Sequence, residues 1–374
     1  MLRIINRSRY ESFTVILYFC VSPISKFLEL FGVSRILTYL VMLSFFLYYV
    51  IWNLNKCTVD IVLFYGICTP LLIYGVIKNG SYINSRTNIY AIFINFFLAY
   101  YMFRVSDLDH LLDSMRKAAY FVLLYYYIEA FMTSFNSDDY MSYAYHIQFF
   151  LCVVFYYALN EKKIVDIFLF LVGVFTMFFF GARGALIGLL FFVVYILLQR
   201  ITKITIVLGL GCVCLATLLM VNAKELLNIL GSIGVSSRTL EKIVSGQFFI
   251  STSRNNLYSI CLSLIKANPF GYGILTSRRL IKYYVYPHSL LFELQLDFGV
   301  GVGSVIFISI VLIVIYLLVK KRSMKYKTIS ALFCILGMVM LMVSSSLYYE
   351  YYIPAIIAIF FNELGRRKRR LSTA

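Results

Sequence analysis

The chain has 374 residues, of which 61% are hydrophobic and 14% charged, and its formal net charge is +17. Soluble domains carry about 25% charged residues and about half apolar ones. This composition therefore excludes a soluble globular protein, because only lipid can solvate so much apolar surface. The basic residues stand in short clusters between apolar stretches, as topogenic signals do, and not along one polar face. Nucleic acid is therefore not an expected partner.

Apolar stretches long enough to cross a bilayer recur along the chain, and a crossing needs about 20 mainly apolar residues. The expected spans are 12–31, 34–52, 58–77, 87–104, 118–134, 144–159, 164–180, 184–199, 204–221, 290–319, 327–347 and 350–363. The predicted fold class is all-α: a polytopic integral membrane protein of about 12 transmembrane helices. Arg3, Arg7 and Arg9 precede the first span, which we interpret as a retained signal anchor.

The charge bias of the short loops sets the orientation, because Lys and Arg favour the cytoplasmic side. With Arg3, Arg7 and Arg9 inside, the alternate loops that carry basic clusters also lie inside. These clusters are Lys56, Arg104–Lys117, Lys162–Lys163, Arg200–Lys203, Lys320–Lys327 and Arg366–Arg370. Modest exceptions on the outer side are Arg35, Lys78 and Arg86. The expected protein has both termini in the cytoplasm.

One long segment interrupts the series of spans. We expect helices 1–9 in residues 1–221, a large outer loop at 222–287, and helices 10–12 with a basic tail in 288–374, all within one membrane domain. The loop carries eight Lys or Arg against two Glu and is expected to hold short amphipathic helices. It is either a simple solvated loop or a surface that binds an anionic ligand at the membrane.

Two arginines on the outer side are candidate functional residues. Arg183 lies between small residues in Gly181-Ala-Arg-Gly-Ala185, where helices approach closely and a guanidinium can face a cavity. The alternative is that Arg183 only extends to the lipid interface. Arg254 follows the N-cap types Thr252 and Ser253 at the start of a predicted amphipathic helix that Asn268-Pro269 ends. An arginine at a helix N-terminus suits phosphate, although Arg254 could also be a solvated loop residue.

Three histidines occur, and two of them, His146 and His288, are expected near the outer face, whereas His110 falls in an expected cytoplasmic loop. A neutral imidazole can take a proton from a hydroxyl at neutral pH. His288 stands where the long loop returns to the membrane, and Glu293 and Asp297 follow it. Acidic residues within spans are costly and are functional candidates, so either could orient the imidazole or share its cavity.

These motifs, in this order, resemble the O-antigen polymerase and ligase superfamily. They are Gly181-Ala-Arg-Gly184, Ser253-Arg254, Asn268-Pro-Phe-Gly-Tyr-Gly273, His288-Ser289, Asp297-Phe-Gly299 and Gly301. The resemblance covers about residues 164–320. A departure is Ser289, where asparagine is frequent in the family.

The resemblance implies glycosyl transfer from an undecaprenyl-diphosphate-linked oligosaccharide to an acceptor hydroxyl. Arg183 and Arg254 would hold the diphosphate, and His288 would activate the hydroxyl, with inversion at the anomeric carbon. Weaker substrate-binding supports would be Arg238, Arg278, Arg279, Glu293 and Asp297. Arginines can stabilise the leaving diphosphate without a metal, so no metal or other cofactor is expected. The active site would be periplasmic, at the bacterial inner membrane.

Three functions stay open from the sequence. A polymerase would pass the glycan to another lipid-linked repeat unit, and this is the preferred interpretation because polymerases are the larger branch. A ligase would pass it to lipid A–core. A flippase would move lipid-linked sugar without chemistry, but it predicts functional charges near mid-membrane in paired repeats, whereas these charges gather on one side. A chain-length regulator is a further candidate partner.

Overall fold

The computed structural model describes residues 2–29, 31–79, 92–132, 140–180, 182–199, 218, 221–232, 237–246, 252–281 and 286–372. Within these ranges every regular element is a helix, which confirms the predicted all-α class. Four described helices are long and apolar enough to cross a membrane: Tyr10–Glu29, Val59–Asn79, Leu290–Val319 and Met324–Val343. Shorter apolar helices are Leu37–Trp52, Ile164–Phe178, Arg183–Leu198 and Tyr352–Gly365. The total of twelve spans stays a prediction, and most of the expected span 204–221 lies outside the described residues.

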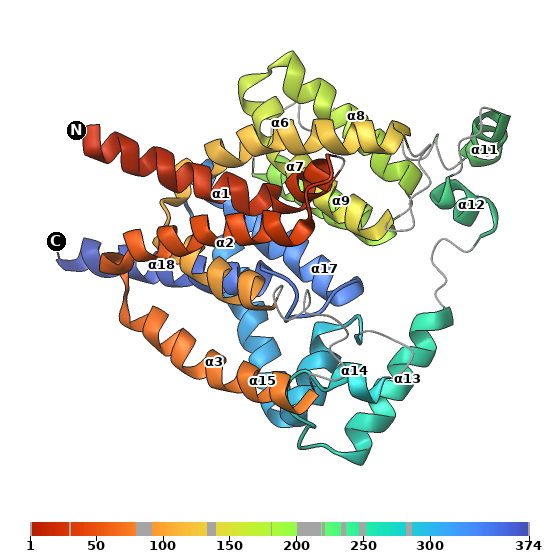
Figure 1. Ribbon diagram of the computed structural model, residues 1–374. Helices are drawn as coiled ribbons and strands as arrows, with labels where there is room; N and C mark the ends of the chain where they lie inside the picture. The colour runs from red at the N-terminus through yellow and green to blue at the C-terminus, as the bar shows by residue number, and fades with distance from the viewer. Residues whose placement is uncertain are drawn as a thin grey trace. The chain divides into compact units, whose positions relative to one another are not determined.

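The chain divides into two compact units, residues 1–45 with 109–250 and residues 46–108 with 251–374. The helices of the first unit are α1 (Leu2–Glu29), the start of α2 (Arg35–Trp52), most of α6 (Leu108–Met132), α7 (Tyr140–Glu161), α8 (Ile164–Phe180), α9 (Arg183–Leu198), α11 (Ala223–Ser232) and α12 (Arg238–Val244). Helix α7 packs against α8 and α9, which lie beside it in Figure 1. Small residues allow this approach, since a Cβ at Gly173 of α8 would stand 2.2 Å from the Leu151 side chain of α7.

Helix α6 corrects one expectation from the sequence. The sequence predicts a cytoplasmic loop that contains residues 104–117 and His110, but α6 begins at Leu108, and His110 is an exposed residue of its first turn. The helix persists because its charges are paired. Arg116 donates to Glu161 over 2.7 Å and also forms an ion pair with the buried Asp166. Charge clusters therefore mark the end of an apolar span without ending the helix.

The second unit contains the end of α2, the 3₁₀ turn η1, helices α3, α5 and α13–α18, and two π-helical turns. Their bounds are η1 (Leu54–Lys56), α3 (Val59–Asn79), η3 (Phe93–Leu98), α5 (Ala99–Val105), α13 (Thr252–Ala267), α14 (Ser277–Leu280), α15 (Leu290–Val319), α16 (Met324–Ala331), η4 (Leu332–Leu336), α17 (Gly337–Val343) and α18 (Tyr352–Ser372). Helices α13 and α14 pack beside α15 (Figure 1).

Helix α13 is the amphipathic helix that the sequence predicts. Its buried face carries Leu257, Cys261 and Ile265, which pack with Ile281 and with Leu296 of α15. The spacing of four residues places the first three on one side of a helix. Helix α13 ends at Ala267, directly before Asn268-Pro269, as expected from the missing N–H of proline.

Helix α15 is broken at Gly299, which has φ 82° and ψ 167°. In a continuous helix, Leu294 and Gly303 would lie about 13 Å apart along the axis. Here a Cβ on Gly303 would stand 2.4 Å from the Leu294 carbonyl oxygen, so the chain turns back on itself at the break. The part after the break, residues 300–319, measures about 30 Å and matches the hydrocarbon core of a bilayer. The acidic residues Glu293 and Asp297 both precede it.

The Asn268–Gly273 turn caps this break with backbone hydrogen bonds. The N–H of Tyr272 donates to the Leu296 carbonyl over 2.7 Å, and the N–H of Gly273 donates to the Asp297 carbonyl over 3.0 Å. In return, the Pro269 carbonyl accepts from the N–H of Val300 over 2.8 Å. These bonds satisfy groups that a broken helix leaves unpaired. Two motifs separated by 23 residues of sequence thus form one structural unit.

This unit requires glycine at both contact points. Gly271 has φ 87°, and a Cβ there would stand 2.4 Å from the backbone nitrogen of Gly299. A Cβ on Gly299 would stand 2.6 Å from the backbone carbon of Phe270. Both obstacles are backbone atoms, which cannot rotate away as a side chain can.

We expect Gly271→Ala to lower the apparent melting temperature of the purified protein, because the left-handed conformation alone costs about 1–2 kcal/mol and the overlap adds to it. The matched control is Gly301→Ala, since Gly301 is helical and a Cβ there meets nothing within 4 Å. A fluorescence melting curve in detergent measures both. Equal melting temperatures for the two variants would contradict the proposed interlock.

Candidate functional site

His288 precedes α15 by two residues and adopts an unusual backbone conformation. Its φ is +53°, a region that residues other than glycine rarely adopt and that is found at functional sites. The ring of Tyr286 packs edge-on to the imidazole, with centroids 4.4 Å apart. The hydroxyl of Tyr258 on α13 donates to the backbone carbonyl of His288 over 3.4 Å. Two tyrosines therefore fix this histidine against α13.

The surroundings of His288 favour its neutral form. Burial and, next, the positive charge of Arg254 lower the pKa of His288 to about 4, and a backbone hydrogen bond to Val343 opposes them. The imidazole is therefore unprotonated at neutral pH. Its Nδ1 atom is buried and has no hydrogen-bond partner among the described residues. Arg254 is thus near enough to His288 for its charge to act on the imidazole, and their joint action on a substrate stays a prediction.

Arg254 lies in the first turn of α13, where the helix dipole adds to its positive charge. Its side chain is half-buried, and it has no ion-pair partner in the described part of the second unit. The positive charge of Arg254 disfavours the protonated form of His288. Because no carboxylate of the described second unit pairs with Arg254, its guanidinium is suited to bind an anionic ligand.

The acidic residues Glu293 and Asp297 are buried and hold the segment that follows α17. The Glu293 carboxylate accepts hydrogen bonds from the Ser346 hydroxyl and, over 2.8 Å, from the N–H of Leu347. The Asp297 carboxylate accepts from the Tyr348 hydroxyl over 2.6 Å. Glu293 is 1% and Asp297 4% exposed, so these bonds offset part of the cost of burying two polar groups. Their predicted binding of substrate stays a prediction.

The other predicted residues occupy separate places. Arg183 is the first residue of α9, as expected from its motif, and it is half-buried in the first unit. Whether it meets Arg254 and His288 stays a prediction. Arg279 is half-buried in α14, whereas the side chains of Arg238 and Arg278 lie outside the described part of the chain. His146, the other histidine expected near the outer face, belongs to α7 of the first unit, and its ring centroid lies 5.8 Å from that of Tyr126.

Sequence reasoning missed a contact between α3 and the Asn268–Gly273 turn. The side-chain amide of Asn79 donates to the Ile274 carbonyl over 3.0 Å, and Gly75 leaves room for that carbonyl. The ammonium of Lys78 consequently lies beside Gly273, 3.9 Å from where a Cβ would stand. The sequence offers one signal for this contact: Lys78 is a basic residue on the expected outer side, against the preference of Lys and Arg for the cytoplasmic side.

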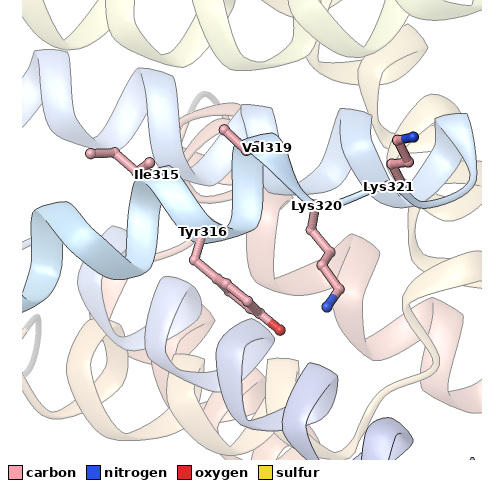
Figure 2. A pocket seen from close by; sticks show the side chains of 5 residues that line it. All are labelled: Ile315, Tyr316, Val319, Lys320 and Lys321. Atoms are coloured by element: carbon pink, nitrogen blue, oxygen red, sulfur yellow. The ribbon is translucent and has the colours of Figure 1, made fainter.

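A pocket in the second unit lies away from this site, at the far end of α15. Ile315, Tyr316, Val319, Lys320 and Lys321 line it, and Tyr316 and Lys320 extend in the same direction (Figure 2). The Lys320 ammonium lies 5.1 Å from the centre of the Tyr316 ring. About 20 residues separate this pocket from the Gly299 break, or roughly 30 Å of helix. An aromatic residue followed by lysines is typical of a membrane interface.

The fold and the site define a helical membrane protein with a cation and a neutral histidine at the start of a broken helix. Residues 168–308 match the family described as O-antigen ligase, and this segment carries that domain. The match confirms the resemblance to the O-antigen polymerase and ligase superfamily. Comparison with curated proteins and with solved structures found no match. All the predicted site residues lie within the matched segment.

We expect Glu293→Ala to destabilise the segment after α17, because the buried N–H of Leu347 loses its acceptor at a cost of about 1–3 kcal/mol. Limited proteolysis should then cut between residues 344 and 351 faster than in the unmodified protein. The control is Glu225→Ala on α11, where the side chain is exposed. The assignment of Glu293 as an anchor fails if both variants are cut at the original rate.

Proposed function

We propose that the protein is a surface-polysaccharide (O-antigen) polymerase of the bacterial inner membrane. It transfers an undecaprenyl-diphosphate-linked glycan to the hydroxyl of another lipid-linked repeat unit, without a metal and with inversion. The observation that carries the proposal is the placement of Arg254 beside a neutral His288 inside the segment that matches the O-antigen ligase family. Membership of residues 168–308 in that family supports the proposal that the protein is an enzyme acting on polysaccharide.

The donor diphosphate would bind at the start of α13. Its negative charge grows as the glycosidic bond breaks, and a preplaced guanidinium stabilises that charge without reorganisation. Arg254 supplies the guanidinium, and the α13 N-terminus supports it. Arg183, Arg238, Arg278 and Arg279 are the proposed further cations. The polyprenyl chain stays in the bilayer, so the basic segment needs to reach only the membrane surface.

His288 would act on the acceptor. The acceptor oxygen forms a bond to the anomeric carbon from the side opposite the diphosphate, which leaves with the electron pair of the broken bond. The hydroxyl proton passes to the imidazole, which is free to accept it at neutral pH because its pKa is lowered. The buried Nδ1 without a partner is the available acceptor atom. Attack from the opposite side gives inversion.

The proposed topology has twelve spans, both termini in the cytoplasm and the site in the periplasm. The positive-inside bias of the short loops supports it, as does the agreement between several expected spans and observed helices, such as 164–180 with α8. The net positive outer loop is then explained by its anionic substrate.

A ligase is the second candidate, and the description of the matched family favours it. Donor chemistry would be the same, and only the acceptor would differ, with lipid A–core replacing the second repeat unit. The residues of the site are compatible with both a polymerase and a ligase, so the reaction product must distinguish the two.

We expect Arg254→Ala and His288→Ala each to reduce chain extension by at least about 100-fold, the usual contribution of one charge-stabilising or acid–base group. Each variant is expressed in a deletion strain, and surface polysaccharide is separated on a gel with membrane abundance measured in parallel. Lys266→Ala, on an exposed position of α13, and His146→Ala are the matched controls.

The deletion strain itself distinguishes the two candidates. Core plus one repeat unit indicates a lost polymerase, whereas unmodified core indicates a lost ligase. Full-length ladders from both the Arg254 and His288 variants would remove these residues from the mechanism.

A further inference from the structure

The pocket at the end of α15 has no part in the proposed transfer reaction. Its lining residues are Ile315, Tyr316, Val319, Lys320 and Lys321, and we call it the lysine hollow. Its volume is about 470 Å³, within the range of about 300–1,000 Å³ of small-molecule sites. The side chains of Ile315, Val319 and Lys321 are exposed, so the hollow opens to the surroundings of the helix.

An exposed apolar stripe runs along α15 and ends at the lysine hollow. Its members recur at spacings of three and four residues, which places them on one side of the helix. They are Val305, Ile308, Leu312, Ile315 and Val319, each more than half exposed. From Ile308 to Val319 the stripe measures about 17 Å, close to half of a hydrocarbon core of about 30 Å. It therefore matches the length of an acyl chain in one leaflet.

The three consecutive basic residues after the stripe differ in their partners. Arg322 donates from its Nε atom to the buried Glu363 of α18 over 3.0 Å, so its charge is neutralised within the second unit. No carboxylate forms an ion pair with Lys320 or Lys321 in the part of the chain that the structure describes. The hollow thus holds two positive charges that the described acids leave uncompensated.

The Lys320 side chain is held in place at the hollow. Its ammonium lies 5.1 Å from the centre of the Tyr316 ring, and Figure 2 shows both side chains extending in the same direction. The Tyr316 ring in turn packs edge-on against Phe360 of α18, with centroids 5.7 Å apart. An ammonium over an aromatic face is attracted to the ring. A side chain that is already ordered loses less freedom when a ligand binds.

We propose that the lysine hollow binds an anionic phospholipid, with the phosphate at Lys320 and Lys321 and an acyl chain along the apolar stripe. Basic pockets at helices of membrane proteins bind such head groups. A zwitterionic lipid carries its own cation, which two lysines repel, and a free phosphate has no use for the stripe. Lysines that served only as a topological signal would need no hollow beside them. The inference does not depend on the proposed transfer reaction.

The test is native mass spectrometry of the delipidated full-length protein in detergent. The probes are phosphatidylglycerol and phosphatidylcholine with the same acyl chains, and the Kd of the most tightly bound lipid is compared. The unmodified protein should prefer phosphatidylglycerol by about 30-fold, the usual contribution of two lysines beside an anionic lipid. Inorganic phosphate at equal concentration should not displace it, because phosphate cannot bind the stripe.

We expect Lys320→Gln with Lys321→Gln to abolish this preference. Ile315→Trp fills the hollow without a change of charge and should weaken phosphatidylglycerol binding by at least about 10-fold, since excluding two CH₂ groups of the lipid is enough for that loss. The control for charge is Lys162→Gln with Lys163→Gln, an exposed adjacent pair in the first unit. The control for size is Val305→Trp, on the same stripe but about 15 Å from Ile315. Both controls should bind as the unmodified protein does.

Three results would overturn the proposal. The first is an unchanged preference in the double lysine variant, and the second is an equal loss in the Lys162 and Lys163 control, which would assign the effect to net charge. The third is tighter binding of undecaprenyl phosphate than of phosphatidylglycerol, because the occupant would then be a polyprenyl lipid. If the double lysine variant cannot be purified, unchanged binding by Ile315→Trp contradicts the site on its own.

Discussion

The backbone contact between Gly271 and Gly299 is the constraint on which the rest of the second unit depends. It ends the first part of α15, supplies N–H groups for the carbonyls of Leu296 and Asp297, and takes up the N–H of Val300. The Asn268 side-chain amide donates to the Gly271 carbonyl over 2.7 Å, and a Cβ at either glycine would overlap with backbone atoms of the other segment. Because the break divides α15, the acidic residues lie on its short first part, outside the stretch that matches a bilayer.

The buried residues Glu293 and Asp297 connect the first part of α15 to the C-terminal part of the chain. Glu293 and Asp297 bind residues 346–348, and Val343, three residues before this segment, bonds with His288. Each of the two acids has a hydrogen-bond donor, as the burial of a polar group requires. The site thus draws on two sequence segments: the matched segment carries the arginine and the histidine, and Val343 and Ser344 contact the histidine and its neighbour Tyr286.

Hydropathy predicts the bounds of a helix well where the helix ends with its apolar stretch. An example is α3, which is expected at 58–77 and observed at Val59–Asn79. Hydropathy failed for residues 108–117, because ion pairs of Arg116 continue a helix beyond its apolar part. The Asn268–Gly273 motif was recognised only as a turn, since its partner at Gly299 is distant in sequence.

The proposed function requires Arg183, Arg254 and His288 each to face the periplasm. Cysteine labelling tests it most directly, in a variant with the eight native cysteines replaced and a single Arg183→Cys, Arg254→Cys or His288→Cys substitution added. A thiol reagent that cannot cross the inner membrane should label all three positions from the periplasm, and a Lys320→Cys control only after that membrane is opened. If any of the three is labelled only after opening, the transfer mechanism is contradicted.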